Sequence, residues 1–145
     1  MAPRAVIISA EMARPEITQI ILVEDTRAFE AGAYESASFI VPIGVDVCQL
    51  AIDRQSLPPA PRGEKSCIKV QAWISYDGGR KFDLLIGFTT SGGEIRDPRT
   101  GEVMNFPNSY ARRHIKPQYK ENDRMMKVLV DSRVPLTTKI IVEFW

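Results

Sequence analysis

The 145-residue chain has two cysteines, one histidine and almost no net charge, and each scarcity excludes a class of protein. Cys48 and Cys67 form no C-x-x-C pair, and a single histidine cannot complete a standard structural zinc site with them. Nineteen basic and eighteen acidic residues give a net charge of +1, which argues against a dedicated nucleic-acid-binding protein. We therefore expect no metal site, no cofactor and no nucleic-acid partner.

The sequence also lacks long hydrophobic runs. No stretch approaches the ~20 apolar residues that span a bilayer, so we expect no membrane partner. The N-terminal segment MAPRAVIISAEMARPE carries Glu11 and no small-residue cleavage site, so we expect no secretory signal peptide. A disulfide between Cys48 and Cys67 requires neighbouring strands, and free thiols in a reducing compartment are the favoured interpretation.

Motifs of the common catalytic sites are missing as well. The chain contains no P-loop, G-x-G-x-x-G, G-x-S-x-G or H-E-x-x-H pattern. His114 lies in ARRHIKP between cationic neighbours, which is typical of a surface loop. No pair among the eighteen acidic residues is singled out by its spacing. The sequence therefore predicts a protein that is not an enzyme, with no catalytic residues.

What the sequence does contain is side-chain alternation of period two, the pattern of half-buried β-strands. Ten prolines and nine glycines leave little room for helices. Long connections at residues 57–65 and 90–117 fit crossovers between sheets, and Ile95 and Val103 flank a small hairpin within the second. We predict an all-β fold, a two-sheet, jelly-roll-like β-sandwich of about eight strands. It comprises residues 17–145, with 90–117 as a long insertion. The predicted strands are residues 17–25, 36–42, 45–53, 66–77, 81–89, 124–131 and 137–145.

The alternation also predicts which side chains face outward. In residues 66–77, Trp73 shares the polar face with Lys69 and Gln71. Trp145 shares a polar face with Glu143 in the last strand. Outward aromatic side chains are typical of contact surfaces, although the insertion at 90–117 is an alternative cover for them. In residues 81–89 the pattern places one set of apolar side chains inward: Phe82, Leu84, Ile86 and Phe88.

The segment SYDGGRKF links two of these strands. Ser75, Asp77, Gly79 and Phe82 have the spacing S-x-D-x-G-x-x-F, which resembles the Asp-box found on β-hairpins of sialidases and other β proteins. Gly78 and Gly79 allow the positive φ of a tight hairpin, and Asp77 and Ser75 accept hydrogen bonds from turn N–H groups. We interpret these residues as structuring the hairpin rather than as an active site.

Residues 1–16 are predicted to be an N-terminal arm or an edge strand. RAVIISA is apolar and lies between Pro3 and Pro15, a pattern that suits strand addition to a neighbouring subunit. The residues expected to contact a partner are Arg4, Val6, Ile7, Ile8, Trp73, Arg112, Arg113 and Trp145.

In size, strand pattern and arm, the chain resembles the jelly-roll-type decoration (auxiliary or cement) proteins on the capsids of tailed bacteriophages. The resemblance implies a non-enzymatic structural protein, a homo-oligomer and specifically a trimer, that stabilises a viral shell by binding the major capsid protein. It implies a location on the virion surface after assembly in the host cytoplasm. The alternative is a carbohydrate-binding β-sandwich module, with Trp73, Tyr76 or Tyr110 as stacking platforms.

Overall fold

The computed structural model describes residues 11–14, 17–21, 28–29, 31–93, 95–104, 108–117 and 123–145. The predicted contacts Arg4, Val6, Ile7 and Ile8 lie outside these residues. Within them, none of the helices is long and apolar enough to cross a membrane.

Almost all regular structure in the described residues is β. The one helix is the short 3-10 turn η1 (Arg54–Ser56). The strands are β1 (Glu11–Arg14), β2 (Ile17–Ile21), β3 (Ala28–Phe29), β4 (Gly32–Glu35), β5 (Phe39–Ile40), β6 (Val47–Asp53), β7 (Ile68–Ser75), β8 (Asp83–Thr90), β9 (Ile95–Arg96), β10 (Val103–Met104), β11 (Asn108–His114), β12 (Met125–Ser132), β13 (Leu136–Thr137) and β14 (Ile140–Phe144).

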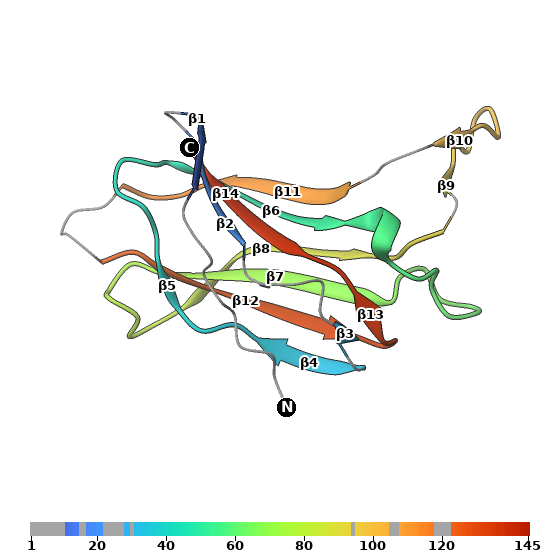
Figure 1. Ribbon diagram of the computed structural model, residues 1–145, viewed down its shortest axis with the longest axis horizontal. Coiled ribbons are helices and arrows are strands. Elements are labelled where there is room, and N and C mark those ends of the chain that lie inside the picture. The colour runs from blue at the N-terminus through green and yellow to red at the C-terminus, as the bar shows by residue number, and fades with distance from the viewer. Residues whose placement is uncertain are drawn as a thin grey trace.

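The long strands form two antiparallel sheets packed face to face (Figure 1). The first has the order β1-β2-β14-β6-β11; the second has the order β4-β12-β7-β8, with β5 paired to β12 beside β4. The chain crosses from the first sheet to the second between β6 and β7, and returns between β8 and β11. This exchange of strands between two Greek-key sheets is the jelly-roll arrangement, and it confirms the predicted fold class.

The core lies between the sheets and is filled by alternate residues of each strand, as period-two alternation requires. Its largest fully buried apolar side chains are Phe144, Leu50, Ile52, Ile68, Ile86 and Met126. Cys48 and Cys67 are both buried and unbonded, and burial raises the pKa of the Cys48 thiol to about 12. The core is therefore continuous and needs no disulfide.

One strand differs from the sequence-based expectation. Residues 108–114 form β11, an edge strand of the first sheet, whereas the sequence predicts no strand in 90–117 beyond the small hairpin at Ile95 and Val103. The hydrophobic pattern of β11 is weak because exposed polar residues occupy much of the strand, including Arg112, Arg113 and His114. Within residues 1–16, predicted to be an arm or an edge strand, Glu11–Arg14 form β1, which pairs with β2 at the edge of the first sheet.

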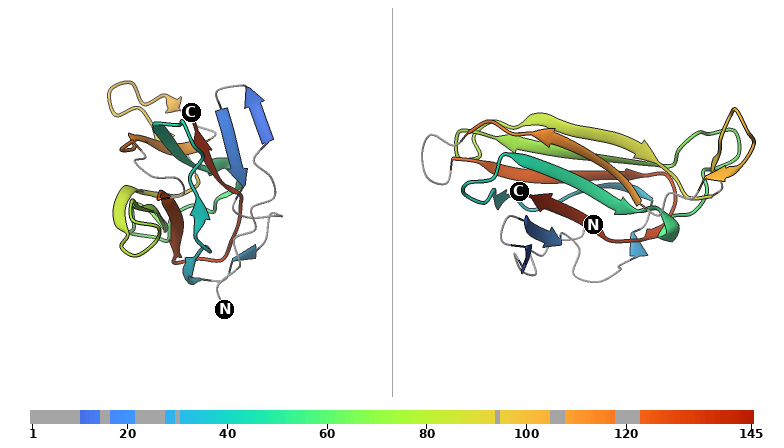
Figure 2. Two further views of the ribbon diagram at one scale, coloured as in Figure 1. Left: turned by 90° about the vertical axis from the view of Figure 1, so that its left-hand side faces the viewer. Right: turned by 90° about the horizontal axis from the view of Figure 1, so that it is seen from above.

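The hairpin β9–β10 matches the predicted pairing of Ile95 with the region of Val103. It extends beyond one end of the sandwich, as two views show (Figures 1 and 2). The connection itself is therefore a short strand pair followed by a return to the first sheet.

Candidate functional site

The β7–β8 hairpin is built by the hydroxyl of Ser75 and the carboxylate of Asp77. Ser75 Oγ donates to Asp77 Oδ1 at 2.7 Å and accepts the Gly79 N–H at 2.9 Å. Asp77 Oδ1 also accepts the N–H groups of Arg80 and Lys81, both at 3.0 Å. These hydrogen bonds lower the pKa of the Asp77 carboxyl, and the bond from Ser75 has the largest effect. Every partner of this pair is a group of the turn, so the arrangement orders the hairpin.

Glycine at positions 78 and 79 is required by the turn. Their φ angles are 74° and 94°, in the left-handed region that side chains with a Cβ rarely adopt. A Cβ at Gly79 would also lie 3.1 Å from Met125 Sδ and 4.0 Å from Phe82 Cζ. Phe82 and Met125 therefore flank the same point of the turn.

Phe82 and Leu84 do not follow the inward pattern that alternation predicts for residues 81–89. The β7–β8 register shifts between Ala72 and Trp73, so that Ala72 pairs with Ile86 but Trp73 pairs with Leu84. A β-bulge inserts one extra residue on one strand, here Leu85, and reverses the face of the residues beyond it. Leu84 is therefore 51% exposed beside Trp73, while Ile86 is 1% exposed in the core.

The bulge completes an outward apolar surface, which we call the Trp73 patch: Ile40, Trp73, Phe82, Leu84 and Met125. Ile40 pairs with Met125 at one side of the patch and is 52% exposed. Lys127 pairs with Trp73, and its Nζ lies 4.6 Å from the centre of the Phe82 ring. Its aliphatic stem therefore extends from the position beside Trp73 toward Phe82. Single exposed apolar side chains are ordinary, but a contiguous group is typical of a contact surface.

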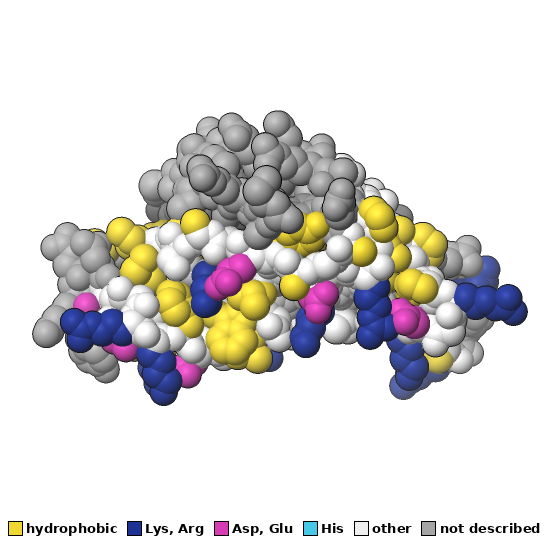
Figure 3. All heavy atoms as spheres, turned by 90° about the horizontal axis from the view of Figure 1, so that it is seen from below, with side chains coloured by type: hydrophobic (Ala, Val, Ile, Leu, Met, Phe, Trp, Pro, Cys, Tyr) yellow, Lys and Arg dark blue, Asp and Glu magenta, His cyan; other side chains and the backbone are white. Residues whose placement is uncertain are grey.

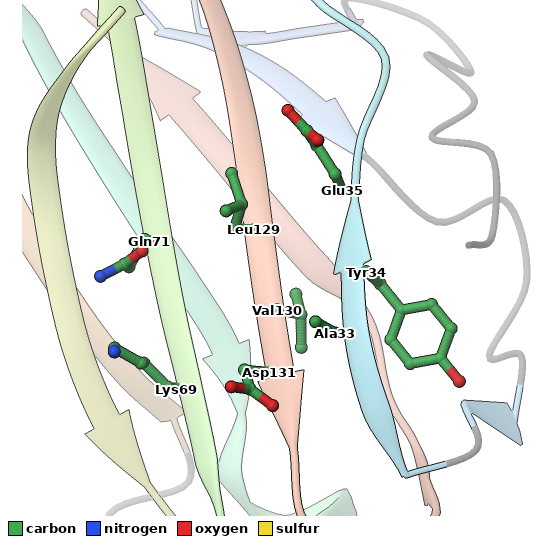
Figure 4. A pocket seen from close by; sticks show the side chains of 8 residues that line it. All are labelled: Ala33, Tyr34, Glu35, Lys69, Gln71, Leu129, Val130 and Asp131. Atoms are coloured by element: carbon green, nitrogen blue, oxygen red, sulfur yellow. The ribbon is translucent and has the colours of Figure 1, made fainter. Parts of the chain in front are cut away.

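Beside the Trp73 patch lies a shallow hollow of about 380 Å³ on the same sheet. Leu129 and Asp131 of β12 lie between Lys69 and Gln71 of β7 and the residues of β4 (Figure 4). Gln71 Oε1 accepts the Trp73 Nε1–H at 3.3 Å, so the hollow adjoins the patch. The view from the side of β4 and β12 shows hydrophobic side chains interspersed with basic and acidic ones (Figure 3). Lys127 of β12 and Glu35 of β4 form an ion pair there, at 2.8 Å.

A second cluster lies on the first sheet, which we call the Arg112 cluster: Gln49, Tyr110, Arg112 and Trp145. The Arg112 guanidinium lies 4.8 Å from the Trp145 ring centre and 5.7 Å from that of Tyr110. Arg112 Nε donates to Gln49 Oε1 on β6. Arg112 and Trp145 are thus brought together, whereas Trp73 lies on the other sheet. Arg113 is exposed and donates from Nη1 to the Arg112 carbonyl at 3.0 Å.

Arg124 is a buried cation for which the sequence offers only a weak signal. It is 2% exposed, and its burial lowers the pKa of the guanidinium. Nη1 donates to the carbonyls of Val45 at 2.8 Å and Lys116 at 3.2 Å, and Nη2 donates to that of Pro42 at 2.8 Å. Arg124 therefore ties together two connections at one end of the sandwich. The only cue in the sequence is an arginine directly before a strongly apolar strand.

The described residues contain no group of three or more His, Cys, Asp and Glu side chains placed to hold a metal ion. His114 is the last residue of β11 and is exposed, rather than in a loop. The candidate sites on the described surface are therefore the Trp73 patch and the Arg112 cluster, which lie on opposite sheets.

The fold identifies the chain as an all-β jelly-roll sandwich, and comparison with known proteins assigns it to no family. No protein-family model matches it, and no curated protein matches it. Among solved structures, it is similar to one described as TmCBM61 in complex with beta-1,4-galactotriose. The TM-score is 0.41 and the sequence identity 13%, over 93% of this chain and 74% of that chain. A likeness this distant carries no information about binding or activity.

Proposed function

We propose that this protein is a non-enzymatic structural protein that docks onto neighbouring protein subunits, as a decoration protein does on a viral shell. The observation that carries the proposal is the Trp73 patch. A bulge in β8 turns Leu84 out of the core and sets it beside Trp73. Bulges beside functional surfaces commonly re-aim a side chain in this way.

The chemistry of the patch favours a protein partner over a sugar. Leu84 and Ile40 are aliphatic, and a sugar ring stacks on flat aromatic faces instead. The three aromatic candidates for stacking also fail to share a surface. Trp73 faces outward from the second sheet, Tyr110 lies on the first, and the Tyr76 hydroxyl accepts the Lys116 N–H at 3.1 Å.

Magnitudes indicate how much of the patch a partner must cover. Leu84 and Ile40 are about half exposed, so covering the remainder contributes on the order of 1 kcal/mol each. Association costs about 4–15 kcal/mol in lost freedom of motion. A stable contact therefore needs Trp73, Phe82 and Met125 covered at the same time, together with surface beyond the patch.

We assign two partners to this function: further copies of the chain, in a trimer, and the major capsid protein of the shell. Jelly rolls are common among viral capsid domains and among lectins, so the fold agrees with this assignment and with the carbohydrate alternative. This proposed function implies that the protein is located on the outer surface of a virion.

Size-exclusion chromatography with light scattering tests the proposal. Wild-type protein is expected to self-associate with increasing concentration, and Leu84→Glu is expected to remain monomeric because it would bury an unpaired charge. Thr89→Glu is the matched control, since Thr89 is also exposed on β8 but lies outside the patch. A wild-type protein that stays monomeric at high concentration, and whose tryptophan fluorescence responds to β-linked oligosaccharides, would favour the carbohydrate alternative instead.

A further inference from the structure

We infer that the Arg112 cluster is a second binding site, which takes a carboxylate of an acidic protein segment. It lies on the sheet opposite the Trp73 patch, so the inference is independent of the proposed function.

The first line of evidence is the way Arg112 is held. The rings of Tyr110 and Trp145 lie 5.7 and 4.8 Å from the guanidinium, and Gln49 accepts the hydrogen bond from Nε. Much of the rotamer entropy that a long side chain loses on binding is therefore already lost. A planar, pre-oriented guanidinium is suited to bidentate recognition of a carboxylate.

The second line of evidence is the edge of the Arg112 guanidinium that carries Nη1 and Nη2. Among the described residues, Arg112 Nη1 and Nη2 have no hydrogen-bond or ion-pair partner, and Arg112 is exposed. Glu143 is the acidic residue of the same row, on β14 across Gln49 of β6, and it has an interaction of its own. The two remaining Nη groups form the fork that an incoming carboxylate accepts from.

The third line of evidence is the local charge. Residues 108–117 carry three cations, Arg112, Arg113 and Lys116, and no acidic residue. This strand and the residues directly after it are therefore locally positive, although the chain as a whole has a net charge of only +1. A concentration of one sign attracts a ligand of the opposite sign and orients it before contact.

The residue types favour a protein ligand over an acidic polysaccharide. Tryptophan, tyrosine and arginine are the residues most enriched at the energetic centres of protein interfaces. One face of the Trp145 ring is already covered by the guanidinium at 4.8 Å, which leaves less of the ring for a sugar to stack on. Tyr110 is 60% exposed, which leaves apolar surface for the residues beside the carboxylate.

A dye-labelled peptide in which glutamate alternates with threonine tests the inference, followed by fluorescence anisotropy with the whole protein. We expect it to bind more tightly than the peptide with every glutamate replaced by glutamine, and less tightly as salt is raised. Arg112→Lys should weaken binding about tenfold, because an ammonium cannot replace the bidentate fork. Arg113→Lys, on the adjacent residue, is the matched control and should change binding less than about twofold.

Three results would overturn the inference: no binding of the glutamate peptide, equal binding of the two peptides, or equal effects of Arg112→Lys and Arg113→Lys. Tighter binding of polygalacturonate than of the glutamate peptide would also overturn it, in favour of an acidic glycan. Tyr110→Ala is a second variant at an exposed position, expected to weaken peptide binding without unfolding the protein. Circular dichroism checks the fold of each variant.

Discussion

Ser75 is a fully buried hydroxyl that hydrogen-bonds to groups of the β7–β8 turn. Ser75→Ala removes the acceptor of the Gly79 N–H and the donor to Asp77. We expect a loss of about 1 kcal/mol in the free energy of unfolding, because the turn loses the hydrogen bonds that the Ser75 hydroxyl makes. Urea denaturation measures it. Ser38→Ala is the control, since Ser38 is exposed and makes no hydrogen bond with the described residues; equal losses would contradict the account.

Asp77 makes the stability of the hairpin depend on pH. Its pKa is lowered in the folded protein, chiefly by the hydrogen bond from Ser75, so folding favours the ionised carboxylate. The contribution is therefore fully present above the ordinary aspartate pKa and is lost as the pH falls below about 4. Urea midpoints of wild type and Asp77→Asn should converge on acidification. A constant difference from pH 7 to pH 3 would show that Asp77 contributes no such dependence.

Arg124 is the residue whose loss should cost most. Arg124→Met would leave the carbonyls of Pro42, Val45 and Lys116 without their donor in the protein interior. We expect the free energy of unfolding to fall by about 3 kcal/mol or more. Arg133→Met removes an exposed arginine paired with Glu64 and should change it by less than about 1 kcal/mol. Comparable losses in the two variants would contradict the structural role of Arg124.

At the scale of elements, one close approach joins two connections between the sheets. Gly92 donates its N–H to the Pro58 carbonyl at 2.7 Å, and a Cβ on Gly92 would lie 1.9 Å from the Leu57 carbonyl oxygen. Gly92→Ala must therefore displace backbone, and we expect a marked fall in the melting temperature. Gly87→Ala is the control, because its Cβ would meet only side-chain atoms at 3.7 Å or more. A stable Gly92→Ala variant would show that the two connections separate freely.

The face assignment of β8 has its own test. Leu84 is 51% exposed and Ile86 is 1% exposed, so Leu84→Glu should leave monomer stability nearly unchanged while Ile86→Glu unfolds the protein. Circular dichroism on heating distinguishes them. If both variants unfold, the strand follows the unbulged alternation and Leu84 faces inward.

Strands β7, β8 and β11 show how much of the fold the sequence predicts. Alternation predicts β7 correctly, because Ile68, Val70, Ala72 and Ile74 are apolar and all lie in the core. It fails at Leu84, since a bulge is a property of the pairing between two strands and leaves no mark in one strand's sequence. It misses β11 because an edge strand with exposed arginines has little hydrophobic pattern. The Arg112 cluster is likewise a consequence of pairing: β11 and β14 lie on either side of β6.

At the scale of the whole molecule, the jelly roll presents two different outer faces. The second sheet carries aliphatic and aromatic side chains around Trp73; the first carries a cation between two aromatic rings around Arg112. A protein that ties neighbours together needs at least two such contacts, pointing in different directions. The proposed function rests on the Trp73 patch, and the Arg112 cluster on the opposite sheet would add a second contact that points in another direction.

The two tryptophans of the chain lie one on each face, so they report on the two contacts separately. The most direct measurement is the ¹⁹F NMR spectrum of protein labelled with 5-fluorotryptophan, recorded over a concentration series. The Trp73 signal, identified by its loss in Trp73→Phe, is predicted to shift and broaden with concentration while the Trp145 signal stays constant. A Trp73 signal that does not change up to the highest soluble concentration would contradict self-association through the Trp73 patch.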